Sequence, residues 1–426
     1  MKLVKFLLTP PIVAISVFLF VALGAQAAWR IDTYNSKPVL TDDNWTIYLT
    51  VIDPGKKTYK LGIDSYSQGN LSYVSGSGEL DLTTVEADAG IKITTLARSM
   101  MEKVTTLTSV KIPETVTLID GSCFNGCTEL TTVDPFLPGT VRSVSDSAFN
   151  GCTKLRGDLV ITNDNITVIG RNTFSGTLIS SVAFSPKLVE LKDQSFNACT
   201  NCSRISPMDF PCLKTVGGWL FNPSPIEGDT LTFSSPDFSS VGFGAFTGCR
   251  FTNLVFSSSV KTMGGGGGAF GSNPNLETVR CIWRKKGVSV GGSCSIGGFA
   301  NCPKLTEFTI PFRGSFKMAS NVFNGCASLK DIYFWGTAPT AFENWYLPAN
   351  GGSYSAYHYV FHCCKSEAEQ AWLAYSQPLT DADKERATYP GGRCFGVKPS
   401  ASYQPNAWLV WELSPYDPLG LMIQVR

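Results

Sequence analysis

The chain has 426 residues, of which 43% are hydrophobic and 16% are charged, and its formal net charge is +1. This composition excludes an intrinsically disordered chain, and the near-neutral charge excludes a general nucleic-acid binder. The 40 glycines and 24 prolines indicate many short strands and turns. The length fits two or three ordinary domains or one long repeat array.

Residues 1–27 have the features of a secretory signal peptide. Lys2 and Lys5 precede the apolar run "IVAISVFLFVALG", and "AQA" at 25–27 supplies a small-x-small cleavage signal. We therefore expect a secreted or cell-surface protein whose mature chain begins near Ala28. The alternative is an uncleaved membrane anchor, because the apolar run is long for a signal core. No later stretch approaches the ~18–20 apolar residues of a spanning helix, so we expect no integral membrane segment after signal removal.

Residues 28–90 are predicted to form an N-terminal β-rich cap. "NWTIYLTVID" (44–53) alternates apolar and polar residues, and "GSGELDLTTV" (76–85) is typical of a strand that leads into the next segment. A cap is expected here because the end of a repeat array exposes an apolar face.

An internal repeat runs through residues 91–335. Its unit is an aliphatic residue, four intervening positions, Phe, two small or polar residues, Cys, and Leu three positions later, as in "VRSVSDSAFNGCTKL" (141–155). We call the repeated phenylalanines the kernel Phe residues; they stand 22–29 residues apart at Phe124, Phe149, Phe174, Phe196, Phe221, Phe246, Phe270, Phe299 and Phe323. A degenerate tenth copy, with Met101 in the Phe position, precedes them.

The other positions of the unit are also occupied regularly. Cys stands three residues after the kernel Phe at Cys127, Cys152, Cys199, Cys249, Cys302 and Cys326, and Thr177, Ser224 and Asn273 replace it elsewhere. The position five residues before Phe is occupied by Ile, Val, Leu, Met or, at 294, Cys, and only Gly265 lacks a side chain to bury. We predict that the kernel cysteines form a ladder of buried thiols.

A unit this short cannot bury its own apolar face, so neighbouring units must stack. The segments "LTSVKI", "LTEFTI" and "LKDIYF" alternate as half-buried strands do, and strands of successive coils would pair in parallel. The predicted fold is a leucine-rich-repeat solenoid: a β-rich right-handed coil with parallel strands, irregular or short-helical connections, about ten repeats of 22–29 residues, and terminal caps. The kernel Phe residues would form an internal stack.

The unit resembles the BspA-type leucine-rich repeats of bacterial surface proteins, which follow roughly "V-x-x-I-x-x-x-A-F-x-G-C-x-x-L-x-x-V-x-I-P". The best matches are "VRSVSDSAFNGCTKL" and "LTEFTIP". The resemblance implies an exported, curved solenoid that binds other proteins or mediates adhesion, and it brings no catalytic residues. The substituted Cys positions and the long Phe270–Phe299 interval suggest a looser second half.

The repeat pattern ends after Trp335, and residues 336–426 are predicted to form a C-terminal cap or small accessory module. "YHYVFHCC" (357–364), "AWLVWEL" (407–413) and "GLMIQVR" (420–426) resemble strands, and "SEAEQAWLAYS" (366–376) resembles a short helix. The segment 280–298, with four cations beside Trp283, is either a solvated loop or an interaction loop.

Two cysteine-containing segments have residue types that occur in metal or redox sites. His358 and His362 precede Cys363 and Cys364, and these residue types bind zinc, but the spacing fits no familiar zinc module. Ordinary packing, or a disulfide from Cys363 or Cys364 to a residue such as Cys394, is the favoured explanation of the segment. Cys199 and Cys202 form C-x-x-C, yet they occupy the Cys and Leu positions of one unit and should face the core as small hydrophobic residues.

The run "KTMGGGGGAFGSNPNLETV" (261–279) satisfies a loose dinucleotide-binding pattern. A phosphate loop needs a helix start after the glycines, which "AFGSNPN" does not provide, so we interpret the run as a lengthened and weak coil. No triad or carboxylate spacing stands out. We therefore predict no cofactor, no metal and no enzyme activity.

The predicted function is non-catalytic binding of extracellular or host proteins. The expected contact residues occupy solvent-facing positions of the last repeat strands, namely Glu307, Thr309, Asp331, Tyr333 and Trp335. Tyr and Trp dominate binding hot spots, although a C-terminal cap that covers them is an equal alternative. Recognition of glycans by the same surface, or an enzyme or metal site in the C-terminal segment, remain as further hypotheses.

Overall fold

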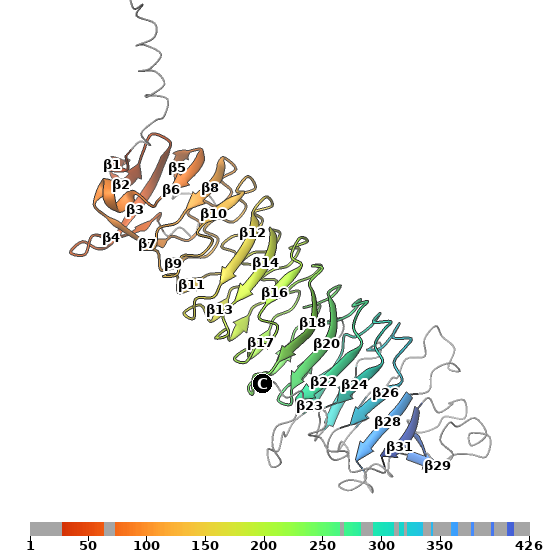
Figure 1. Cartoon of the computed structure of the whole chain (residues 1–426). Coiled ribbons are helices and arrows are strands. Elements are labelled where there is room, and N and C mark those ends of the chain that lie inside the picture. The colour runs from red at the N-terminus through yellow and green to blue at the C-terminus, as the bar shows by residue number, and fades with distance from the viewer. Residues whose placement is uncertain are drawn as a thin grey trace, which may run out of the picture.

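The computed structural model of the chain describes residues 28–63, 73–264, 268–282, 293–310, 315–318, 322–334, 342–343, 359–364, 376–378, 393–395 and 407–412. Within them the coils stack along one long axis, with parallel strands paired from each coil to the next (Figure 1). This arrangement confirms the predicted β-rich solenoid. Among these residues, no helix is both long and apolar enough to cross a membrane.

Each coil contributes one longer strand to a parallel ladder on one side of the solenoid. These strands are β6 (Gly78–Asp81), β8 (Leu107–Lys111), β10 (Thr132–Asp134), β12 (Arg156–Ile161), β14 (Leu178–Phe184), β16 (Arg204–Ser206), β18 (Glu227–Phe233), β20 (Arg250–Ser257), β22 (Thr278–Ile282), β24 (Glu307–Ile310), β26 (Asp331–Phe334), β28 (Tyr359–Cys364) and β31 (Ala407–Glu412). The ladder is interrupted twice, between β10 and β12 and between β16 and β18.

A second parallel ladder, built mostly from two-residue strands, carries the aliphatic position of the repeat. Its members are β7 (Lys92–Leu96), β9 (Leu118–Ile119), β11 (Ser143–Val144), β13 (Val168–Ile169), β15 (Glu190–Leu191), β17 (Thr215–Val216), β19 (Ser240–Val241), β21 (Thr262–Met263), β23 (Ser293–Ile296), β25 (Ser315–Met318) and β27 (Phe342–Glu343). The buried residue of one short strand pairs with that of the next, as Ile169 does with Leu191, except between β11 and β13, where this ladder is interrupted. This registration keeps the coils in phase.

The N-terminal segment is antiparallel. β1 (Arg30–Tyr34), β2 (Lys37–Thr41), β3 (Trp45–Asp53), β4 (Thr58–Leu61) and β5 (Tyr73–Gly76) pair around β3, and α2 (Val85–Ala89) follows β6. Trp29 and Trp45 are buried here and donate their indole N–H groups to the carbonyls of Asp81 and Glu79. The parallel ladder already begins at β6, inside the predicted cap.

The parallel ladder also extends past Trp335. β28 pairs with β26 and with β31, both in parallel, so the predicted strands in "YHYVFHCC" and "AWLVWEL" continue the solenoid sheet. β29 (Ser376–Pro378) and β30 (Arg393–Phe395) add an antiparallel edge. The predicted helix at 366–376 and the predicted strand at 420–426 lie almost entirely outside the described residues.

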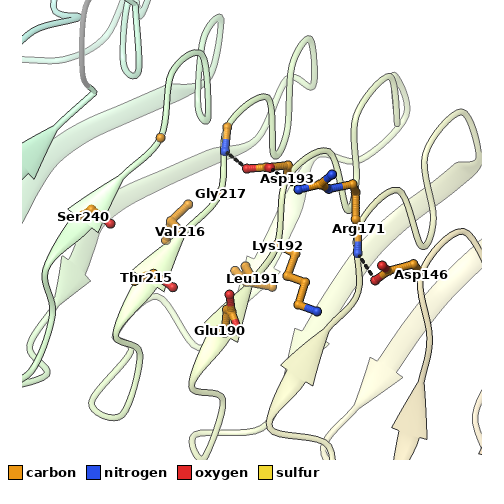
Figure 2. Close-up of a pocket in the computed structure, with 12 residues that line it drawn as sticks. Asp146, Arg171, Glu190, Leu191, Lys192, Asp193, Thr215, Val216, Gly217 and Ser240 are labelled. Carbon is orange, nitrogen blue, oxygen red and sulfur yellow. Dashed lines mark hydrogen bonds and ion pairs between the residues drawn. The ribbon is translucent and has the colours of Figure 1, made fainter.

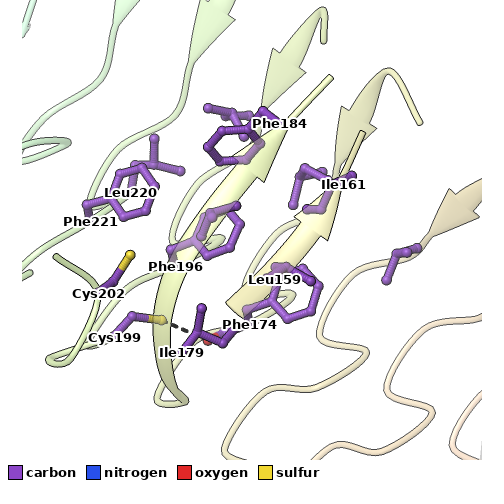
Figure 3. Packing of buried hydrophobic residues seen from close by; sticks show 14 of the residues in the cluster. Leu159, Ile161, Phe174, Ile179, Phe184, Phe196, Cys199, Cys202, Leu220 and Phe221 are labelled. Carbon is purple, nitrogen blue, oxygen red and sulfur yellow. Dashed lines mark hydrogen bonds between the residues drawn. The ribbon is translucent and has the colours of Figure 1, made fainter. Parts of the chain in front are cut away.

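The kernel Phe residues form a continuous internal stack, as predicted. All nine are buried, and consecutive ring centroids lie between 5.0 Å (Phe196–Phe221) and 6.4 Å (Phe299–Phe323) apart. Most neighbouring rings are nearly parallel, as Phe149 and Phe174 are at 7°. Figure 3 shows part of this stack beside the aliphatic side chains of the long strands. Each buried ring contributes roughly 1.5–3 kcal/mol of transfer free energy.

Two assignments to the aliphatic position were wrong. In the glycine-rich coil the buried residue is Met263, which pairs with Val241, and not Gly265, which lies outside the described residues. In the next coil the buried residue that pairs with Met263 is Ile296, whereas Cys294 pairs with Phe316 of the following coil. The physical reason is that strand pairing selects the residue that fills the core, whatever its distance from the kernel Phe. Phe270 remains stacked on Phe246 at 5.4 Å.

Most kernel Phe residues sit in a turn with left-handed backbone on both sides; Phe221 lacks it on the later side, where Pro223 stands, and before Phe299 the positive φ lies at Gly298. The residue two positions earlier has a positive φ in successive coils, for example Ser122 (54°), Ser147 (61°) and Asn172 (53°), and so does the residue two positions later, for example Gly126 (73°) and Gly151 (70°). This conformation turns backbone N–H groups toward the next coil. The Phe124 N–H thus donates to the Ala148 carbonyl, and the Gly126 N–H to the Asn150 carbonyl.

Candidate functional site

A row of positions three residues before the kernel Phe carries charge in the middle of the array. Asp146, Arg171 and Asp193 occupy this row in three successive coils. The Arg171 backbone N–H donates to Asp146 Oδ1 at 2.8 Å, and Arg171 Nη2 donates to Asp193 Oδ2 at 3.0 Å (Figure 2). The Gly218 N–H donates to Asp193 Oδ1 at 2.8 Å. Each carboxylate therefore ties its coil to the next.

Glycines allow the coils beside this row to approach closely. A Cβ on Gly217 would overlap the backbone nitrogen of Asp193, and a Cβ on Gly242 would overlap that of Gly218. Side chains are therefore excluded from these two positions. Three glycines in two consecutive coils, Gly217, Gly218 and Gly242, leave the surface hollow where side chains would otherwise stand.

The hollow is an open groove of about 610 Å³. One wall is formed by the outward residues of β15, β17 and β19, where Glu190 pairs in register with Thr215 and Thr215 with Ser240. Lys192, Asp193 and the three glycines also line it. The groove thus presents carboxylates, two cations, hydroxyls and exposed backbone, which suits the recognition of a polar ligand or a peptide backbone.

Two exposed aromatic side chains directly follow the groove glycines. Trp219 follows Gly218 and is 42% exposed, and Phe243 follows Gly242 and is 43% exposed. Their ring centroids lie 4.9 Å apart at an interplanar angle of 53°. A Cβ on Gly244 would come within 3.0 Å of the Trp219 ring, so the absence of a side chain at Gly244 leaves room for the ring. We call Trp219 and Phe243 the aromatic pair.

Trp219 has a left-handed backbone, with φ of 55°. The equivalent residues of earlier coils are small or polar, such as Ser147 and Asn172, which tolerate this region better than a bulky residue. Residues held in such regions cost on the order of 1–3 kcal/mol and cluster at functional sites. A partly exposed tryptophan in a strained backbone conformation makes Trp219 a candidate contact residue.

The kernel cysteines are buried, as predicted. The hydrogen bond between Cys302 and Cys326 raises the pKa of the Cys302 thiol and lowers that of the Cys326 thiol. Burial raises the pKa of Cys127 to about 12 and that of Cys199 to about 11. Cys202, the second cysteine of the C-x-x-C pair, is buried as well, and burial raises its pKa to about 12. Thiols that stay protonated at neutral pH are poor nucleophiles and poor metal ligands.

Within the described residues, no group of three or more His, Cys, Asp or Glu side chains is placed to hold a metal ion. His362, Cys363 and Cys364 lie on β28, and His358 falls outside the described residues. The zinc hypothesis for this segment therefore stays a hypothesis.

The predicted contact residues lie on the opposite ladder from the groove. Glu307 and Asp331 pair in register on β24 and β26, and so do Thr309 and Tyr333. Trp335 falls outside the described residues. The structure thus aligns four of the five residues across adjacent coils.

The exposure expected of these residues is only partly met. Thr309 is 3% exposed, so its expected contact with solvent was wrong. Glu307 is engaged by Arg280, whose Nε and Nη2 lie 3.1 and 3.2 Å from its carboxylate oxygens. Thr309 pairs in register with Tyr333, whose larger side chain stands on the same face of the sheet.

Sequence reasoning missed the groove and the aromatic pair. The available signal was the segment "VGGWLF" (216–221), where an aromatic residue stands in a turn position that is small or polar in the other coils. The glycines were uninformative by themselves, because glycine is common throughout this chain.

The stacked parallel coils define a repeat protein of the solenoid class. The family model described as BspA type Leucine rich repeat region matches six copies, at residues 79–157, 135–234 and 220–346. These matches span more than half of the sequence, and the chain belongs to this family. No curated protein matches the sequence.

Several solved structures resemble this chain at low identity. A leucine-rich repeat protein from Bacteroides ovatus is 14% identical with a TM-score of 0.41, and the match covers 76% of this chain and 94% of that one. A leucine rich cell surface protein from Faecalibacterium prausnitzii is 17% identical with a TM-score of 0.33, covering 71% and 89%. The pneumococcal vaccine antigen PcpA is 13% identical with a TM-score of 0.36, covering 76% and 93%.

Proposed function

We propose that this protein is a non-catalytic, exported scaffold that binds extracellular proteins through its solenoid surface and serves in adhesion. The observation that carries the proposal is the aromatic pair beside the charged, glycine-floored groove. Exposed Trp side chains anchor protein interfaces, and surrounding polar groups fix their register. Membership of the BspA-type repeat family supports export to the cell surface, and the apolar N-terminal segment with its "AQA" signal supports it independently.

The test is capture of extracellular proteins by the chain from Ala28 onward. A captured protein would be identified, purified and titrated against wild type and a Trp219→Ala/Phe243→Ala variant. Loss of a hot spot of at least ~2 kcal/mol weakens binding about 30-fold. Tyr34→Ala is the matched control, because Tyr34 is 45% exposed and lies in the N-terminal segment. Equal affinity of wild type and the double variant would exclude the aromatic pair as the contact.

The surface of β24 and β26 is a second proposed contact for the same partners. Tyr333 is half-buried there and Asp331 lies on the same strand. Tyr333→Ala and Trp335→Ala belong in the same titration. If neither substitution changes the affinity, this surface plays no part in binding.

A glycan is the alternative ligand for the groove. An exposed Trp ring can stack on a sugar face, and Asp193 and Glu190 provide acceptors for sugar hydroxyls. Binding to a glycan array that is lost in Trp219→Ala would favour this alternative. A blank array together with successful protein capture would reject it.

A further inference from the structure

The two interruptions of the long-strand ladder occur at the same place in the coil. β10 and β16 both have only three residues, and Pro135 and Pro207 follow them directly. The loops that follow are equally long, since the buried Val144 of β11 and Val216 of β17 both stand nine residues after the proline. The two loops can therefore be compared residue by residue.

The chain closes the second interruption itself. The Thr232 N–H donates to the Met208 carbonyl at 2.7 Å, and the Phe210 N–H donates to the Thr232 carbonyl at 3.0 Å. These are the two bonds of a parallel bridge, formed around Asp209 and Thr232. Phe210 is buried and lies 5.9 Å from Phe184 and 6.2 Å from Phe233. An extended segment of the loop thus takes the place of a strand.

Val160 is the counterpart of Thr232 at the first interruption. Val160 directly precedes Ile161, and Thr232 directly precedes Phe233; Ile161 and Phe233 are the last buried residues of their long strands. Each of these two residues stands eight positions before the buried residue of the next short strand. The counterpart of Phe210 is Pro138. Proline has no backbone N–H, so the loop cannot donate to the Val160 carbonyl as Phe210 donates to that of Thr232.

The backbone of β12 faces this gap. The Arg156 N–H donates to the Thr131 carbonyl of the preceding coil at 3.3 Å. In a parallel ladder, alternate residues direct both backbone groups to the same neighbour, so Asp158 and Val160 also face the preceding coil. No backbone hydrogen bond joins the described residues 132–139 to residues 157–161. β12 is therefore an open sheet edge in the middle of the solenoid.

A cleft of about 480 Å³ lies along this edge. Asp158 and Val160 line it from β12, Phe136 and Leu137 from the loop, and Ile161 and Ile166 from beneath. Val160 is 53% exposed, among the most exposed large hydrophobic residues described. The cleft thus combines unpaired strand backbone with apolar walls, which are the two elements of peptide recognition by strand addition.

We propose that the open edge of β12 binds an extended peptide segment of a partner protein as an added parallel strand. One residue of the bound segment donates its N–H to the Val160 carbonyl, as Phe210 does to Thr232. The carbonyl of the residue two positions earlier in the segment accepts the Val160 N–H, as that of Met208 accepts the Thr232 N–H. An apolar side chain of the segment packs against Phe136 and Leu137. This site is separate from the groove and does not depend on it.

The probe is a fluorescent, end-blocked peptide with the sequence Ser-Pro-Met-Asp-Phe-Pro, copied from residues 206–211. We expect saturable one-to-one binding to the chain from Ala28 onward. The matched control peptide carries N-methyl-phenylalanine, which keeps the side chain and removes only the donor. It should bind at least about tenfold more weakly. Equal binding of the two peptides, or no saturable binding of the first, would overturn the proposal.

Two measurements on the protein complete the test. The variant Phe136→Met/Leu137→Asp/Pro138→Phe copies the second loop, should close the edge, and should lose the probe. Its melting temperature is compared with that of Phe136→Met alone, because the Phe136 ring lies 6.1 Å from the rings of Phe149 and Phe174. Amide hydrogen exchange needs no variant: the Val160 amide should exchange quickly in the free protein, slow down with the probe, and contrast with a slow Thr232 amide. A Val160 amide as slow as that of Thr232 without probe would show that the edge is already paired. Failure of this site leaves the aromatic pair untouched, because that contact is tested by Trp219 and Phe243.

Discussion

The thiol of Cys152 donates to the backbone carbonyl of Phe124, one coil earlier, with Sγ and O 3.1 Å apart. The same contact joins Cys199 to Phe174 and Cys326 to Phe299, and Cys127 makes it with Met101, the degenerate kernel residue. Cysteine is small enough for this buried position and still carries a weak donor. The repeat therefore uses its cysteines as inter-coil hydrogen-bond donors.

Replacing Cys152 with Ala should lower the free energy of unfolding by about 1–2 kcal/mol. The substitution removes the hydrogen bond to Phe124 and leaves a small cavity, although the Phe124 carbonyl keeps its bond from the Cys127 N–H. Chemical denaturation measures the change. Lys154→Ala, an exposed substitution two residues away, is the control and should have an effect within ~0.5 kcal/mol. Equal stability of both variants would show that the thiol hydrogen bond does not stabilise the stacking of the coils.

Replacing Phe174 with Ala should cost about 3–5 kcal/mol. Its ring is buried between Phe149 at 5.5 Å and Phe196 at 5.3 Å, so truncation leaves a cavity inside the stack. The exposed Phe243→Ala is the matched control and should change stability by less than about 1 kcal/mol. Thermal and denaturant melts measure the stability of both variants. Similar losses of stability in Phe174→Ala and Phe243→Ala would contradict this expectation.

High pH should destabilise the protein through its buried thiols. Burial raises the pKa of Cys127 to about 12 and that of Cys199 to about 11, from 9.0 for an unburied thiol. Between about pH 9 and the raised values the unfolded thiols lose protons that the folded ones keep, so stability is fully present below pH 9 and falls as the pH rises toward 11–12. The measurement is a series of denaturant melts from pH 7 to 10.5. A Cys127→Ala variant should lose less stability over this interval than wild type, and an equal slope would contradict the thiol origin.

Gly217→Ala should destabilise the protein by roughly 1–3 kcal/mol, because the added methyl group overlaps the backbone of Asp193. Gly139→Ala is the control: its Cβ would meet only Glu114 Oε2, at 4.0 Å. Melting temperatures of the two variants give the comparison. If Gly217→Ala and Gly139→Ala have the same melting temperature, the coils beneath the groove do not approach each other closely.

Trp219→Asn should raise stability and weaken binding at the same time. Asn adopts the left-handed backbone at lower cost, which is worth on the order of 1 kcal/mol, and the exposed ring contributes little to the core. Phe243→Asn lacks this gain, because Phe243 does not have a positive φ. A fall in melting temperature for Trp219→Asn would show that the ring is structural.

The sequence determined the repeat, the kernel Phe stack, the buried cysteines and the parallel strands. It could do so because a unit of 22–29 residues must place the same side chains inward in every coil, and this leaves a periodic trace in the chain. The pattern failed at Gly265 and Cys294, where pairing across coils chose Met263 and Ile296 instead.

Only the tertiary structure decided where the surface departs from the repeat. The groove depends on which glycines of adjacent coils fall side by side, and the exposure of Trp219 depends on a turn whose backbone conformation was not evident from its residues. The open edge of β12 likewise appears only when the two loops of equal length are compared in space. In the sequence Pro138 is simply one of 24 prolines; the structure shows that its counterpart, Phe210, donates a backbone hydrogen bond to Thr232 that Pro138 cannot make. Core positions repeat along the chain and can be identified from one sequence. The environment of a surface position depends on neighbours about one repeat away in sequence, and only the structure shows which residues these are.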